Sequence, residues 1–103
     1  MKLTINERIV LFELLPKEGS FSTLKILREA REALELTPKE RKDWEVQITP
    51  QGAIQWNPKK AKAVEVNMKD VQDIAKAALE KLDKDEKLAD QHVTLYEKIV
   101  LNK

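Results

Sequence analysis

The chain has 103 residues, of which 42% are hydrophobic and 36% are charged, and its formal net charge at pH 7 is +1. This length fits a single domain, residues 1–103, with enough apolar residues for a core. The balanced charge excludes a global field that would draw the protein to nucleic acid or an anionic membrane, and the lack of cysteine excludes disulfides and thiolate metal sites.

A first helix is predicted to begin at Thr4, because Thr4 and Glu7 form a capping-box pair. Pro16 and Gly19 end this segment. Its apolar residues recur at helical spacing and predict one buried face: Ile5, Ile9, Leu11, Phe12 and Leu15.

Two further helices are predicted before residue 44. Ser20 or Ser22 can cap the second, which carries a stripe of apolar residues at steps of three and four: Phe21, Leu24, Leu27, Ala30 and Leu34. The sequence TPKE at residues 37–40 combines a Thr cap, a Pro at the first helical position and a Glu three residues after the cap. It predicts a short third helix that ends near Asp43.

The segment WEVQITPQGAIQW, residues 44–56, alternates apolar and polar residues and predicts a hairpin. A three-residue loop at 50–52 pairs Ile48 with Ile54, whereas a two-residue loop would put the apolar residues on opposite faces. Both tryptophans then share a face with three aliphatic residues: Val46, Ile48 and Ile54. We expect this face to pack on helices, with ligand stacking by Trp44 and Trp56 as the alternative.

The remaining chain predicts one more strand and two helices. Val64 and Val66 alternate with polar neighbours and would extend the hairpin into a three-stranded meander. Asn67 is expected to cap a long helix, and the last helix carries Leu88, His92, Leu95, Tyr96 and Ile99 on one face. The predicted fold is α+β, with an N-terminal unit of about three helices, a central antiparallel hairpin or three-stranded meander, and two C-terminal helices.

Catalytic and metal-binding patterns are not found in the sequence. His92 is the only histidine, and a packed helical histidine is the favoured interpretation of it. Gly19 and Gly52 are the only glycines, so a Gly-rich phosphate loop is excluded. The carboxylates alternate with lysine and arginine on polar helix faces. We therefore expect neither an enzyme nor a bound cofactor or metal.

Protein binding is the leading functional hypothesis, because this chain has more amphipathic helices than one small core covers. The predicted interaction surface lies on the last helix at Leu95, Tyr96, Ile99 and Val100, and homo-oligomerisation is one way to cover it. The alternative is a winged-helix-like nucleic-acid binder, which would use the basic residues Arg28, Arg31, Arg41, Lys59 and Lys60. A small-ligand pocket formed by the tryptophans is a third hypothesis.

Three stretches together resemble small, uncharacterised proteins encoded in bacteriophage genomes. They are ERIVLFELLPKEGSFSTLKILREAREAL at 7–34, GAIQWN at 52–57 and KLADQHVTLYEKIV at 87–100. The resemblance implies an accessory protein of the bacterial cytoplasm that binds a host factor, and it transfers no catalytic or binding residue. The sequence itself also predicts a soluble, cytoplasmic protein without a membrane partner, because charged residues interrupt its apolar segments.

Overall fold

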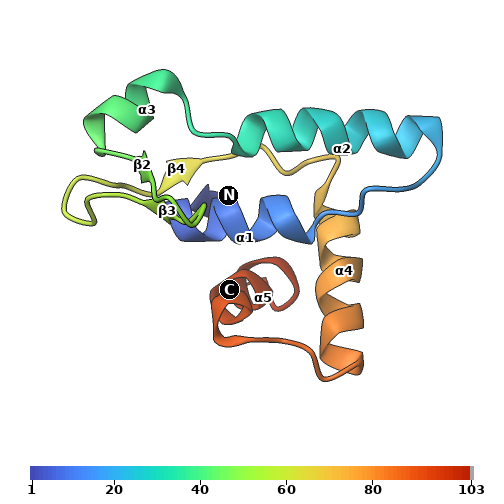
Figure 1. Cartoon of the computed structure of the whole chain (residues 1–103). Helices are drawn as coiled ribbons and strands as arrows, with labels where there is room; N and C mark the ends of the chain where they lie inside the picture. The colour runs from blue at the N-terminus through green and yellow to red at the C-terminus, as the bar shows by residue number, and fades with distance from the viewer. Residues whose placement is uncertain (103) are drawn as a thin grey trace.

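The computed structural model describes residues 1–102 and has an α+β architecture, as the sequence predicts (Figure 1). The elements follow in the order β1 (Lys2–Leu3), α1 (Ile5–Leu14), α2 (Phe21–Leu34), α3 (Pro38–Asp43), β2 (Gln47–Ile48), β3 (Ile54–Gln55), β4 (Val64–Glu65), α4 (Gln72–Lys84), a 3-10 turn (Asp90–His92) and α5 (Val93–Ile99).

Helix α1 lies at the centre of the molecule. Its predicted capping box is confirmed, with the Thr4 hydroxyl accepting from the Glu7 N–H at 3.2 Å and the Glu7 carboxylate accepting from the Thr4 N–H at 2.9 Å. The helix contacts α2, α4, α5 and β1. Apolar residues from all of these elements form one core around it: Leu3, Val10, Leu11, Leu15, Leu27, Leu34, Val66, Met68, Val71, Ala75, Leu79, Leu95 and Ile99.

Helices α2 and α3 are two helices joined by a short connection, so α1 is followed by a joined pair rather than by two independent members of a three-helix unit. Only residues 35–37 separate them, and the Thr37 capping box with Pro38 starts α3 as predicted. Ser20 caps α2. The first turns of α2 extend beyond the body in Figure 1, which leaves Phe21 84% and Leu24 38% exposed although the stripe predicted that both are buried.

The hairpin has the predicted register, but the predicted meander is wrong. Ile48 pairs with Ile54 across the three-residue loop, where Gly52 takes a φ of 86° that suits glycine. Strand β4 does not join the hairpin. It pairs with β1 in a second antiparallel sheet, in which Lys2 lies opposite Glu65 and Leu3 opposite Val64. This pairing carries Leu3 into the core, where it is fully buried.

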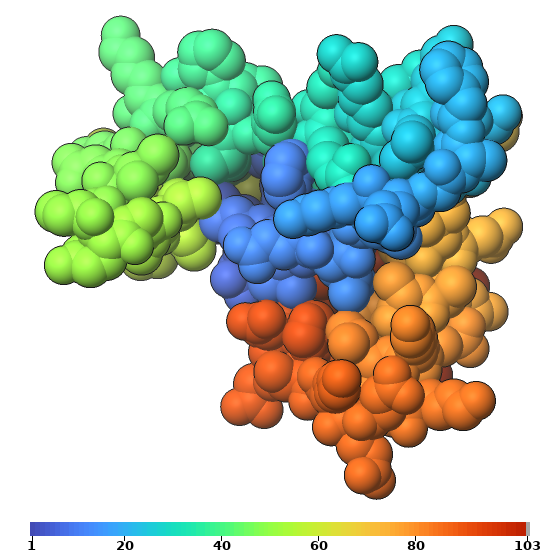
Figure 2. All heavy atoms as spheres, turned by 45° about the vertical axis from the view of Figure 1, so that its right-hand side comes forward, coloured from blue at the N-terminus to red at the C-terminus, as the bar shows by residue number. Residues whose placement is uncertain are grey.

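The apolar face of the hairpin is not covered by helices, contrary to the prediction. Ile48 is 64% exposed, Ile54 is 36% exposed, and Val46 and Trp56 are half-buried. Trp44 is buried, but it is the C-cap residue of α3 rather than a strand residue. The hairpin is short and projects from the body beside α1 (Figure 2), so the helices that enclose α1 do not form a layer over it.

The C-terminal half differs from the prediction in how its helices begin. Val71, not Asn67, is the N-cap residue of α4, and the Asn67 side chain instead accepts a hydrogen bond from the Lys69 N–H at 3.0 Å. Helix α5 follows the 3-10 turn, in which the His92 Nδ1 accepts from the Ala89 N–H at 2.9 Å. His92 therefore holds a local turn of the backbone.

Candidate protein-binding groove

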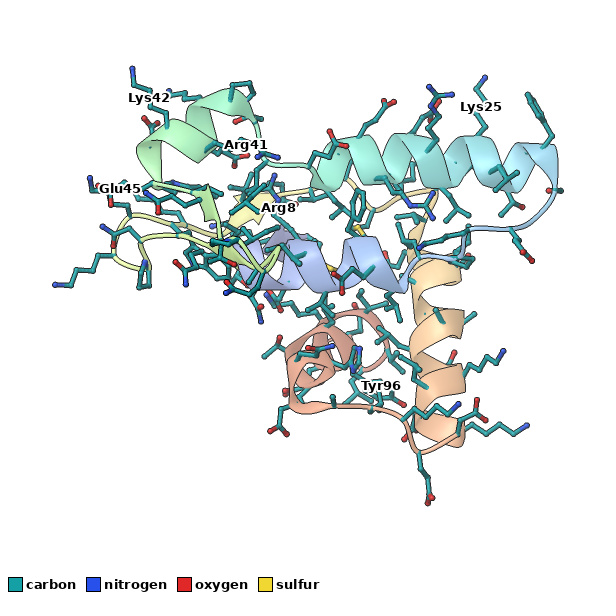
Figure 3. All side chains as sticks on the ribbon, in the orientation of Figure 1. Arg8, Lys25, Arg41, Lys42, Glu45 and Tyr96 are labelled. Atoms are coloured by element: carbon teal, nitrogen blue, oxygen red, sulfur yellow. The ribbon has the colours of Figure 1, made fainter. Side chains whose placement is uncertain are left out.

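The predicted interaction surface on the last helix is wrong, because half of it lies in the core. Leu95 is 0% exposed and Ile99 is 2% exposed. Tyr96 and Val100 are half-buried and pack against the same core. The Tyr96 hydroxyl also donates to Asp83 at the end of α4, at 3.2 Å, so this side chain joins the two C-terminal helices (Figure 3). A seven-residue helix covered on this face by α1 and α4 has no broad apolar face left for a partner.

One exposed apolar surface lies where α1 and strand β3 of the hairpin line a common groove, and another lies at Phe21 and Leu24 on the first turns of α2. Phe12 and Ile54 are each 36% exposed, and Ile9 is half-buried. A groove of about 400 Å³ opens at these three residues. We call it the α1–hairpin groove, and its lining residues are Arg8, Ile9, Phe12, Glu13, Leu34, Glu35, Leu36, Arg41 and Ile54.

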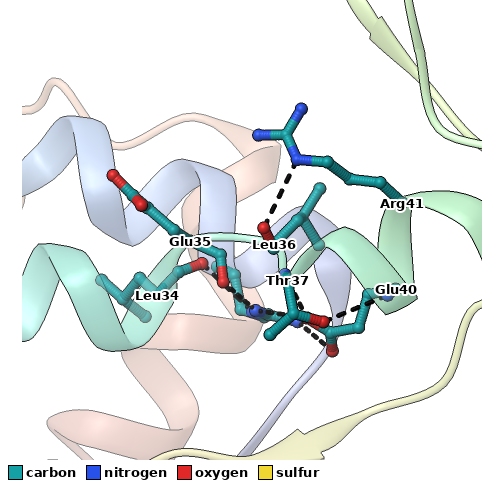
Figure 4. Close-up of polar contacts among 7 residues, drawn as sticks. Leu34, Glu35, Leu36, Thr37, Glu40 and Arg41 are labelled. Carbon is teal, nitrogen blue, oxygen red and sulfur yellow. Dashed lines mark hydrogen bonds and ion pairs between the residues drawn. The ribbon is translucent and has the colours of Figure 1, made fainter.

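Arg8 holds the elements that form the groove in place. Its side chain is 3% exposed. The guanidinium donates to the backbone carbonyls of Leu34 at 3.2 Å and Glu35 at 2.6 Å, which lie at the C-terminal end of α2 (Figure 4). It also donates to both carboxylate oxygens of Glu40 in α3, at 2.9 and 3.1 Å. One side chain of α1 thus fixes the end of α2 and the start of α3 against it.

The charges of Arg8 and Glu40 balance each other, although both side chains are largely buried. Burial alone would raise the pKa of Glu40, but the Arg8 guanidinium and the Thr37 N–H outweigh it and hold this pKa below its usual value. Glu40 is thus ionised at neutral pH, and the charge of Arg8 is matched within the protein. Neither group is left to attract a ligand into the groove.

The rim of the groove carries charges that have no partner of opposite sign. Glu13 lies on α1, Glu35 directly follows α2, and Arg41 lies on α3. Within residues 1–102, none of the three takes part in an ion pair. Arg41 reaches over Leu36 and donates only its Nε to the Leu36 carbonyl, at 3.4 Å (Figure 4). The groove therefore combines an apolar floor with a rim of both signs.

The five basic residues of the nucleic-acid hypothesis do not form one surface. Arg31 is half-buried and donates to the Leu15 and Pro16 carbonyls at the end of α1. Lys60 pairs with Glu45 at 3.1 Å. The remaining three lie on three separate segments: Arg28 on α2, Arg41 on α3, and Lys59 on the loop after β3, which lies at the opposite end of the molecule from α2 in Figure 1.

A second buried ion pair lies on the other side of α1. Glu7 is 3% exposed and accepts from the Lys98 ammonium group of α5 at 2.6 Å. Lys98 also donates to the Lys2 carbonyl at 3.0 Å. Burial alone would raise the pKa of Glu7. The Lys98 ammonium group and the Thr4 N–H lower this pKa by more than burial raises it, so it lies below the usual value. These contacts fasten α5 to α1 and β1.

Arg8 is not among the predicted site residues, although the sequence contains a signal for it. Arg8 follows Ile5 by three residues and precedes Leu11 and Leu15 by three and seven, so it falls within the apolar stripe of α1. A charged residue in such a stripe is expected to have a buried partner. The identity of that partner, Glu40, depends on how α3 folds back onto α1 and is not visible in local spacing.

Comparisons with protein-family models, with curated proteins and with solved structures give no match. Within residues 1–102, the helices are too short or too polar for any of them to cross a membrane. In the same residues, no cluster of three or more His, Asp or Glu side chains is arranged to hold a metal ion.

Proposed function

We propose that this chain is a small non-enzymatic accessory protein that acts by binding another protein through the α1–hairpin groove. The observation that carries the proposal is the exposure of Phe12 and Ile54, which both line an apolar groove. Burying such side chains against a partner is the main favourable contribution in protein association. The resemblance to bacteriophage proteins supports the bacterial cytoplasm as the place of action and a host or phage protein as the partner.

The surroundings of the groove support protein binding over catalysis. Its floor is held rigidly by the Arg8–Glu40 pair, whose donors and acceptors are engaged with each other and with the ends of α2 and α3. A site with a preformed apolar centre and a polar rim has the anatomy of an interface. Within the groove, no histidine or hydroxyl group adjoins a carboxylate that could act as its base.

The test is affinity capture from bacterial lysate with tagged wild-type chain and two variants. Phe12→Ser removes an anchor from the groove. Phe21→Ser is the matched control, because Phe21 is also an exposed phenylalanine but lies at the free end of α2. The lysate should also contain the untagged chain, so that self-association is detected together with host partners. Nuclease treatment before capture removes contacts mediated by nucleic acid.

We expect a protein that is retained after nuclease treatment, captured by the wild type and by Phe21→Ser, and lost with Phe12→Ser. Circular dichroism should show that both variants are folded. Retention of the same protein by Phe12→Ser, or its loss only with Phe21→Ser, would overturn the proposal. Loss of all captured protein on nuclease treatment would instead favour the nucleic-acid hypothesis.

A further inference from the structure

The charges at the rim of the groove indicate which kind of partner fits it. A partner that offers a cation to Glu13 and Glu35 and an anion to Arg41 would complement these three exposed charges, which have no ionic partner within residues 1–102. Arg8 does not add to this set of charges, since Glu40 matches its charge. An anionic ligand would engage Arg41 but would be repelled by two carboxylates.

A second copy of the same chain offers these complementary charges by symmetry. In a two-fold dimer the same patch is used on both subunits, so that residue i contacts residue j and j contacts i. Two grooves placed face to face can bring Arg41 of each copy to an acidic residue of the other. We propose that the α1–hairpin groove is a self-complementary interface through which two copies of this chain form a dimer. This inference rests on the proposed function and names its partner.

The apolar side chains of the groove fit the same arrangement. Phe12 and Ile54 line the groove, and Ile48 lies opposite Ile54 on the adjacent strand with 64% of its surface exposed. Because the hairpin projects from the body (Figure 2), these isoleucines are accessible to a second molecule. In a two-fold dimer each hairpin lies along the α1 face of the other copy, and the exposed isoleucines of both copies become covered.

Charge reversal tests the dimer with the wild type, two rim variants and one control variant. The acidic-rim variant carries Glu13→Lys and Glu35→Lys, which covers both carboxylates that can pair with Arg41. The basic-rim variant carries Arg41→Glu. Sedimentation equilibrium at low and moderate salt measures the molecular mass of each protein alone and of a 1:1 mixture. We expect the wild type to have twice the monomer mass at high concentration and each variant alone to be monomeric, because like charges then oppose each other.

The mixture of the two variants is the decisive sample. In a heterodimer, Arg41 of the acidic-rim variant meets Glu13 or Glu35 of the basic-rim variant, and the two introduced lysines meet the introduced glutamate. The heterodimer should therefore form with an affinity at least about tenfold higher than the self-affinity of either variant. Arg28→Glu is the matched control outside the groove and should stay dimeric, because Arg28 is 84% exposed on α2. The lysines lie near the C-terminal ends of α1 and α2, where positive charge is favourable, so the acidic-rim variant should fold.

Three results would overturn the inference: a wild type that is monomeric at all concentrations, a dimer that neither reversal weakens, or a mixture that does not associate. The proposed function fails separately. If the wild type is monomeric but captures another protein that Phe12→Ser loses, the groove is a binding site and only the identity of its partner is wrong. If the dimer forms by charge-paired contacts and nothing else is captured, self-assembly is its whole binding activity.

Discussion

Replacing Arg8 by methionine should cost about 3–5 kcal/mol of the free energy of unfolding. The side chain is 3% exposed and makes four hydrogen bonds, two to carbonyls at the end of α2 and two to the Glu40 carboxylate. Methionine keeps much of the aliphatic packing but leaves a half-buried carboxylate without its cation, and breaking one partner of a buried pair costs about 3–5 kcal/mol. This is a large part of the total stability of a small domain, which is about 5–15 kcal/mol.

Urea denaturation followed by tryptophan fluorescence measures this loss. The matched control is Arg28→Met, because Arg28 is 84% exposed and lies 3.8 Å from Glu32. It should change the free energy of unfolding by less than about 1 kcal/mol. The double variant Arg8→Met with Glu40→Gln should be more stable than the sum of the single losses implies, since the second change removes the unpaired charge. Equal small losses for Arg8→Met and Arg28→Met would refute the assignment of Arg8 as the clamp.

Three other predictions follow from individual residues. Glu86 has a φ of 56°, where a non-glycine residue is strained by about 1–2 kcal/mol, so Glu86→Gly should raise the free energy of unfolding, and a lower urea midpoint would contradict this. The pKa of Glu7 lies below its usual 4.5 in the folded chain, so its stabilisation is complete above that pH and is lost as pH falls through the folded pKa. Glu7→Gln should therefore flatten the acid dependence of stability, and unchanged dependence would show that Glu7 does not contribute. Burial and the Asp83 carboxylate raise the pKa of Tyr96, the only tyrosine, so Asp83→Asn should lower the pKa in an absorbance titration, and an unmoved titration curve would exclude that contact.

Local signals predicted much of the fold. The capping boxes at Thr4 and Thr37 and the Ser20 cap depend on residues three positions apart, and each starts its helix in the structure. The Ile48–Ile54 register followed from alternation and loop length. These features are set within a few residues, so the sequence is sufficient to assign them.

Tertiary features were predicted less well, because they depend on contacts between distant segments. Strand β1 is only two residues long, and its partner β4 lies more than 60 residues further along the chain. The apolar stripe of α5 correctly indicated a buried face, but not that α1 and α4 cover it completely enough to leave no surface for a partner. The apolar face of α1 at Phe12 differs from that of α5, because the hairpin projects away from the helices and no element covers Phe12 completely. The groove is exposed for this reason.

The candidate site could not be found from the sequence because it too depends on contacts between distant segments. Its lining comes from α1, from the α2–α3 junction and from β3, and the Arg8–Glu40 pair that brings the first two together spans 32 residues. Apolar periodicity identifies residues that are suited to burial, but not which of them the fold leaves exposed.

Site-specific photo-cross-linking tests most directly whether the α1–hairpin groove binds protein. A photoreactive benzophenone amino acid replaces Phe12 in one form of the chain and Phe21 in another, and each form is expressed and irradiated in bacterial cells. Both positions are exposed phenylalanines, but only Phe12 lines the groove. We predict a covalent protein adduct from position 12, with the mass of two copies of this chain, and no matching adduct from position 21. Absence of an adduct at position 12, or a stronger adduct at position 21, would contradict the account.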